Sequence, residues 1–221
     1  MKSVGRLWLL GLLLGLGLFL IWEAQEAARL QALRPLVSQF QILGPDRSQL
    51  PDLTLGSTPL GALSEWGPPA ELGLFEGPDG SAGVEAILVL NRPPYLGTLV
   101  LVLEPETVVL AALEEDRLEG HTLANGYRRH GLAEAARPKL APSPVVELAF
   151  VPRTRLRPGL WRQLFGEPDQ IWQPGQEQKY WLYPQRGLVI SLAKGGSQWL
   201  HFVTLERWGE MLKRIQPSPP S

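Results

Sequence analysis

The first hydrophobic feature of the chain is a continuous apolar segment, Leu7–Trp22, whose sixteen residues carry no charge. Lys2 and Arg6 precede it, and acidic residues follow it. Its length lies between the core of a signal peptide and a full membrane span. No position after the segment offers the pair of small residues that signal-peptide cleavage requires. The pattern therefore predicts an uncleaved transmembrane signal anchor over residues 1–22.

The charges beside this segment predict its orientation. A positive N-terminal flank places the N-terminus in the cytoplasm and the bulk of the chain outside it. We therefore expect a single-pass protein of the cytoplasmic (inner) membrane, with membrane lipid as the partner of the helix. Gly11 and Gly15 are spaced as a small-xxx-small pair, which either packs two such helices together or reflects the frequency of glycine in membrane spans.

An internal repeat lies beyond the anchor. Residues 58–69 align with residues 157–168, and their prolines, aromatic residues and glycines coincide. Each copy predicts a two-turn helix that ends at Gly67 or Gly166, because proline fits the first helical position and glycine the left-handed residue after the last.

Apolar segments at the spacing of a three-stranded meander follow each predicted helix. They span 84–90, 99–103 and 108–113 in the first copy, and 179–183, 188–193 and 198–205 in the second. The predicted fold class is α+β: an N-terminal transmembrane helix, then two tandem modules, each a short helix packed on a three-stranded antiparallel meander. The predicted divisions are an anchor (1–22), a stalk helix and linker (23–52), a first module (53–119), a connector (120–144), a second module (145–207) and a C-terminal segment with a disordered tail (208–221).

Both faces of each predicted sheet are apolar, whereas a sheet with one solvated face alternates apolar and polar residues. In the second module, a turn at 184–187 pairs residues whose numbers sum to 371, and a turn near 194–197 pairs residues whose numbers sum to 391. Together the two pairings place Trp181, Tyr183 and Trp199 on one face. A second layer must cover the additional apolar face, and it is either the other module with the connector, or a partner protein. In the latter case these three aromatic residues are the binding anchors.

Arginines recur with period two at Arg153, Arg155 and Arg157. On a strand they share one face, where they either meet an acidic partner or anionic headgroups, or form a solvated edge that discourages strand pairing.

Composition removes several functional classes. Of 221 residues 44% are apolar and 19% charged, with a net charge of −1, three histidines and no cysteine. The lack of cysteine excludes disulfides, thiolate metal sites and lipidated cysteines. Balanced charge argues against a nucleic-acid partner. The histidines have no metal-ligand spacing and no nucleophile elbow occurs, so we predict no catalytic residue, metal or cofactor.

The order L-x-G-x-T, short helix, aromatic-G-x-P and three-stranded sheet resembles the small outer-membrane-assembly lipoproteins of the SmpA/OmlA (BamE) type, and the tandem-repeat β-lactamase-inhibitor proteins that share their fold. The first copy carries the motif at Leu55, Gly56, Thr58, Trp66, Gly67 and Pro69. The second keeps Phe165, Gly166 and Pro168, but has Arg155 and Arg157 in place of Gly and Thr. The chain also lacks the lipidated cysteine of those lipoproteins. The resemblance implies a non-catalytic extracytoplasmic module that binds another protein.

We therefore expect a membrane-anchored extracytoplasmic protein-binding or assembly module, such as an accessory subunit of a membrane complex. An extracytoplasmic enzyme with a pocket between the two modules is the alternative.

Overall fold

The structure, a computed structural model, describes residues 41–42, 48–50, 53–78, 80–92, 95–123 and 126–216. Its elements are β1 (Gln41–Ile42), β2 (Ser48–Leu50), β3 (Leu53–Leu55), η1 (Leu60–Trp66), β4 (Glu71–Glu76), β5 (Ala82–Arg92), β6 (Tyr95–Leu103), α2 (Thr107–Ala112), η2 (Glu114–Asp116), β7 (Arg117–Thr122), β8 (Arg128–Leu132), α3 (Ala136–Leu140), β9 (Val145–Pro152), α4 (Pro158–Phe165), β10 (Gln170–Trp172), β11 (Gln178–Tyr183), η3 (Pro184–Arg186), β12 (Leu188–Ala193), β13 (Gln198–Val203) and α5 (Trp208–Ile215).

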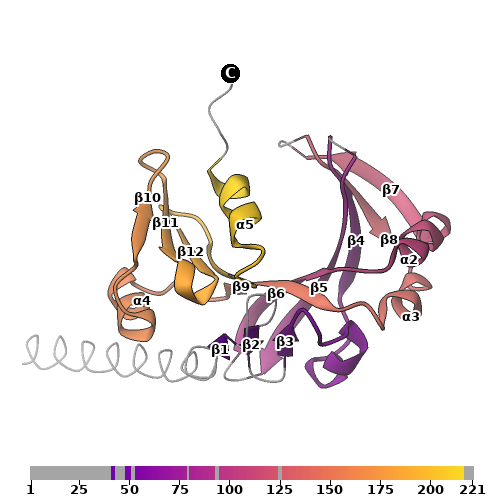
Figure 1. Cartoon of the computed structure of the whole chain (residues 1–221), viewed down its shortest axis with the longest axis horizontal. Helices are drawn as coiled ribbons and strands as arrows, with labels where there is room; N and C mark the ends of the chain where they lie inside the picture. Colours follow the sequence, from indigo (N-terminus) through magenta and orange to yellow (C-terminus); the bar gives the residue numbers. More distant parts are fainter. Residues whose placement is uncertain are drawn as a thin grey trace, which may run out of the picture.

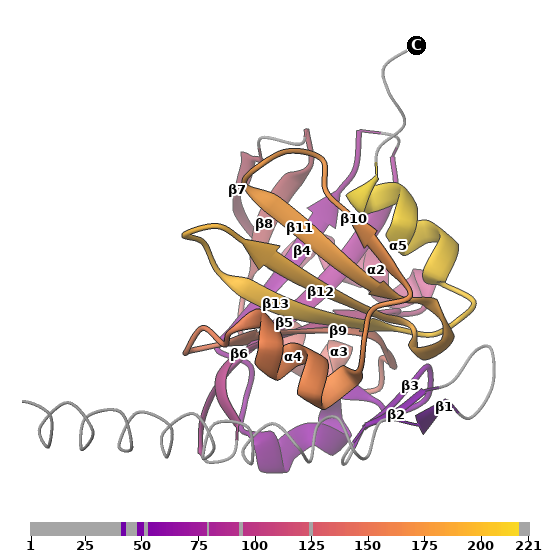
Figure 2. The ribbon, with the colours of Figure 1, turned by 90° about the vertical axis from the view of Figure 1, so that its left-hand side faces the viewer.

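One antiparallel sheet of ten strands dominates the described part of the chain, in the order β10-β11-β12-β13-β9-β6-β5-β4-β8-β7. The sheet curls into a cradle, with β10–β12 in one arm, β4, β7 and β8 in the other, and β9, β6 and β5 in the floor (Figure 1). Figure 2 views the molecule from the side of the first arm, with the second arm behind it. Helix α5 stands inside the cradle, on its concave side.

The main hydrophobic core lies on the convex side of the sheet, against η1, α4 and the small sheet β1-β2-β3. One cross-strand row runs through it from β5 to β12 and is fully buried: Ala86, Leu101, Leu148, Phe202 and Leu188. Burying one large aliphatic or aromatic side chain stabilises a fold by about 1.5–3 kcal/mol. Because this row crosses both halves of the chain, the two halves share one core.

The predicted fold class of two tandem modules is therefore wrong. Strand β6 of the first half pairs with β9 along Gly97–Leu103, and β9 pairs with β13 of the second half. Each predicted three-stranded sheet had an unpaired edge and an apolar face that a two-turn helix cannot cover, and joining the edges into one curled sheet satisfies both.

Residues 108–113, predicted as a strand, lie mostly in helix α2. The run Leu110-Ala111-Ala112 favours a helix, and in this short segment it outweighs the β-branched pair Val108-Val109.

The prediction of a transmembrane protein also needs correction. No helix in the described ranges is long and apolar enough to cross a membrane. Residues 1–22, which carry the predicted anchor with Gly11 and Gly15, lie outside the described residues, as do most of the predicted stalk and the tail from residue 217.

The two copies of the repeated segment form equivalent short helices, η1 and α4. Pro59 and Pro158 stand at their N-terminal ends, and Gly67 (φ 94°) and Gly166 (φ 81°) end them. Positive φ at both glycines explains why the same residue recurs there.

Candidate functional site

The concave side of the sheet carries an aliphatic surface, which we call the concave floor. Along β5 buried side chains on the convex side alternate with more exposed ones on the concave side, up to Val89, which is 49% exposed. Strand pairing places the partners of these residues on β6 and β9 on the same side. The concave floor consists of Ile87, Val89, Thr98, Val100, Val102, Ala149 and Val151.

Helix α5 covers the neighbouring part of the concave side. Met211 packs with Leu182, Val189 and Val203 in a second hydrophobic cluster. Aromatic residues extend this cluster across the strands, with Trp172 stacked on Tyr180 at a centroid distance of 5.1 Å. Residues 208–215 therefore provide the cover for this apolar face, a role that the sequence prediction gave to the other module, the connector or a partner.

The three predicted aromatic anchors do not share a face. Strands β12 and β13 pair residues whose numbers sum to 390, as in Val189 with His201, and this shift by one residue turns β13 over. Trp181 and Tyr183 are each 2% exposed in the convex core, where the Tyr183 hydroxyl donates to the Gly166 carbonyl at 3.1 Å. Trp199 is half-buried on the concave side, 6.0 Å from the Tyr180 ring between centroids.

The three predicted arginines lie beyond the end of β9, in the loop before α4, and all are exposed. Arg153 donates to the side chain of Asn91 and Arg155 to the carbonyl of Ala193. Arg157 is the residue before the first turn of α4. These positions hold the loop against two strands instead of forming a row on one strand.

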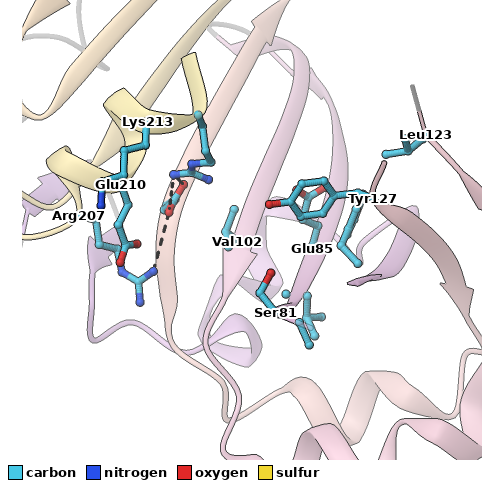
Figure 3. A pocket seen from close by; sticks show the side chains of 14 residues that line it. Ser81, Glu85, Val102, Leu123, Tyr127, Arg207, Glu210 and Lys213 are labelled. Carbon is cyan, nitrogen blue, oxygen red and sulfur yellow. Dashed lines mark hydrogen bonds and ion pairs between the residues drawn. The ribbon is translucent and has the colours of Figure 1, made fainter. Parts of the chain in front are cut away.

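A groove of about 840 Å³ opens between α5 and the β4–β5 and β7–β8 turns, beside the concave floor. Figure 3 shows Arg207, Glu210 and Lys213 on one side of the groove and Tyr127 and Leu123 on the other. Val102 and Ser81 lie between them, and Glu85 overlaps the ring of Tyr127 in this view. The groove is lined by Phe75, Ser81, Ala82, Gly83, Val84, Glu85, Val102, Leu123, Tyr127, Glu147, Arg207, Glu210, Lys213 and Arg214. Both predicted modules and the predicted connector thus contribute to it.

Glu147 is the best-paired charge in the groove. Its side chain is only 3% exposed, and its two carboxylate oxygens accept from Nη2 of Arg214 at 2.9 and 2.8 Å. Nε2 of His201 lies 3.0 Å from Oε2, and Nη1 of Arg207 lies 3.8 Å from Oε1. Burial alone would raise the pKa of Glu147, but the His201 hydrogen bond and the Arg214 charge outweigh it and hold the pKa at about 2. This carboxylate therefore fastens α5 to the sheet.

Glu85 lies in the same cross-strand row as Glu147, with Val102 between them. It is half-buried, and among the residues that the structure describes it has no hydrogen-bond or ion-pair partner. The two nearby arginines bind other carboxylates: Arg129 pairs with Glu71, and Arg214 with Glu147. Burial raises the pKa of Glu85, and the charge of Glu147 adds to this effect against the opposing charges of the arginines.

Sequence reasoning missed both glutamates. Each is the only charged residue within an apolar strand segment, at 84–90 and at 145–151. That signal was available, because an acidic residue within such a segment must find a cation or an opening to solvent.

No group of three or more metal-binding side chains occurs within the described ranges. Comparison with family models, with curated proteins and with solved structures finds no match, so the resemblance to the outer-membrane-assembly lipoproteins stays a prediction.

Proposed function

We propose that this chain is a protein-binding module that holds a segment of a partner protein on its concave floor, beside the groove. The observation that carries the proposal is a contiguous, mainly aliphatic surface across three central strands, whose side chains are half-buried apart from the exposed Val89 at its rim. Contiguous exposed apolar surface of this kind is typical of binding sites, whereas scattered apolar residues are not.

The surroundings of the floor support a polypeptide as the occupant. Interfaces combine an apolar centre with a polar rim and are enriched in aromatic residues. Here Trp199 borders the aliphatic centre on one side, and the charged groove wall formed by Arg207, Glu210 and Lys213 borders it on the other. The floor lies between helix α5 and the arm formed by β4, β7 and β8, so these elements flank an occupant of the floor (Figure 1).

Selection from a random-peptide display library tests this proposal. The full chain is the bait, and Val100→Glu places a charge in the centre of the floor. Val108→Glu is the matched control, because Val108 is 69% exposed on α2, outside the floor. We expect the wild type and Val108→Glu to enrich the same peptides and Val100→Glu to lose them, with the fold of each variant checked by circular dichroism. Equal enrichment by all three would refute the proposal.

Acid–base catalysis in the groove is the second candidate function. It is favoured by Glu85, a carboxyl group whose pKa is raised by burial in a groove, which is the usual state of a catalytic acid. An activity panel with chromogenic ester, glycoside and phosphate substrates tests it: turnover by the wild type that Glu85→Gln abolishes would favour catalysis over binding alone.

A further inference from the structure

We infer that the groove recognises a cationic side chain, lysine or arginine, of the bound partner segment, and that Glu85 is the group that receives it. The inference rests on the proposed function, since it concerns the segment held on the concave floor.

The first step of the argument is the pairing of the other charges. Glu147 is occupied by Arg214, His201 and Arg207. Arg207 also pairs with Glu104 outside the groove lining. Of the charges that remain, Glu210 and Lys213 are exposed on α5, where water solvates them. Glu85 is therefore the half-buried charge without a partner.

The second step concerns the cost of this arrangement. A carboxylate that is partly removed from water and unpaired destabilises the free protein, and a cation from a ligand removes that cost on binding. The raised pKa of Glu85 has burial as its largest cause, in agreement with this state. Such a group adds specificity to an interface, because a partner without the matching cation leaves the carboxylate desolvated.

The third step selects the class of cation. A divalent metal ion needs several oxygen ligands, and the other buried carboxylate of the groove, Glu147, is already held by an arginine and a histidine. Glu85 alone suits an ammonium or guanidinium group, which needs one carboxylate and an apolar path for its methylene chain. Val102, which lies beside Glu85 in the groove lining, provides that path.

The same geometry disfavours an anionic ligand. An anion would lie beside the unpaired Glu85 carboxylate, while the arginines of the wall, Arg207 and Arg214, already bind glutamates. Like charges brought together at an interface suppress binding.

The experiment compares two isosteric variants on peptides selected from a random display library. Glu85→Gln removes the charge from the groove floor, and the control Glu65→Gln removes one from the exposed surface of η1, on the convex side and outside the groove lining. Peptides enriched by the wild type are sequenced, and their affinities for the three proteins are measured by titration calorimetry. We expect lysine or arginine at one position of the enriched peptides. The affinity of these peptides should fall by at least about tenfold for Glu85→Gln and stay within about twofold of the wild-type value for Glu65→Gln.

The outcomes separate the two proposals. Enriched peptides without a basic residue, or equal affinity for Glu85→Gln and the wild type, overturn the role of Glu85 and leave the binding function standing, provided that Val100→Glu abolishes capture. Failure of the wild type to enrich any peptide, or enrichment that Val100→Glu does not change, overturns the binding function itself.

Discussion

The pairing of Glu147 predicts a specific pH dependence of stability. In the folded state the pKa of this carboxyl is about 2, against 4.5 for the free side chain. A depressed pKa means that the ionised form stabilises the fold, fully at pH values above 4.5 and progressively less as the pH falls toward 2. At about 1.4 kcal/mol per pKa unit the contribution at neutral pH is about 3 kcal/mol.

The substitution Glu147→Gln keeps the shape of the side chain and removes its charge. We expect the variant to be less stable than the wild type by about 3 kcal/mol at pH 7 and by about 1 kcal/mol at pH 3. Taking the difference between two proteins at each pH cancels the titration of the other carboxyl groups. Urea denaturation followed by tryptophan fluorescence measures both values, since the chain has eight tryptophans.

Glu119→Gln, on the exposed edge strand β7, is the control for the loss of one glutamate and should leave stability unchanged at both pH values. The reasoning fails if the difference between wild type and Glu147→Gln is the same at pH 7 and pH 3, because the carboxylate would then contribute through packing alone.

Three further predictions test the fold and the groove. Trp161→Ala should lower the free energy of unfolding by about 3–5 kcal/mol, measured by urea denaturation, because this fully buried indole would leave a cavity; a loss below 1 kcal/mol would contradict the core as described. Gly187→Ala should lower the free energy of unfolding by about 3 kcal/mol, because its new Cβ would lie 2.1 Å from the Val203 carbonyl oxygen. Gly195→Ala, at a similar positive φ but with open space around it, should lower the free energy of unfolding by about 1 kcal/mol. Equal shifts in melting temperature for the two variants would refute the contact. Glu85→Gln should make the protein more stable than the wild type at neutral pH, because a raised pKa means that the ionised form of Glu85 destabilises the fold. This gain in stability should vanish below pH 4.5. Urea denaturation at both pH values measures it, and a variant less stable than the wild type at neutral pH would refute the prediction.

The elements that local residues define were accessible from the sequence. Prolines and glycines at both ends of 60–66 and 158–165 mark the short helices, since these residues act through their own backbone angles. The hairpins that connect β11, β12 and β13 are marked in the same way, by Gly187 and Gly195 with positive φ.

The arrangement of these elements was not accessible, because it depends on long-range pairing. Nothing within β6 or β9 indicates that they pair with each other across the connector, and this pairing converts two predicted modules into one sheet. The register of β13 depends on a single residue in a turn, and that residue decides which face receives Trp199.

The candidate site was missed for the same reason. Glu85 and Glu147 are far apart in sequence, and only the register of β5, β6 and β9 brings them into one row with Val102. The C-terminal helix that forms one wall of the groove carries no motif that assigns it to the concave side. Trp208, Met211, Leu212 and Ile215 follow helical spacing and predict an apolar helix face, but not the surface that it covers.

Site-specific photo-crosslinking in the cells that produce the protein tests the central claim most directly. A photoreactive amino acid is placed at Val89 on the concave floor, and at Val108 on α2 as the matched exposed position. The account predicts a discrete crosslink to a partner protein from position 89, its loss when Val100→Glu is added, and no such crosslink from position 108. The same crosslink from both positions, or one from position 89 that Val100→Glu leaves unchanged, would contradict the concave floor as the binding surface.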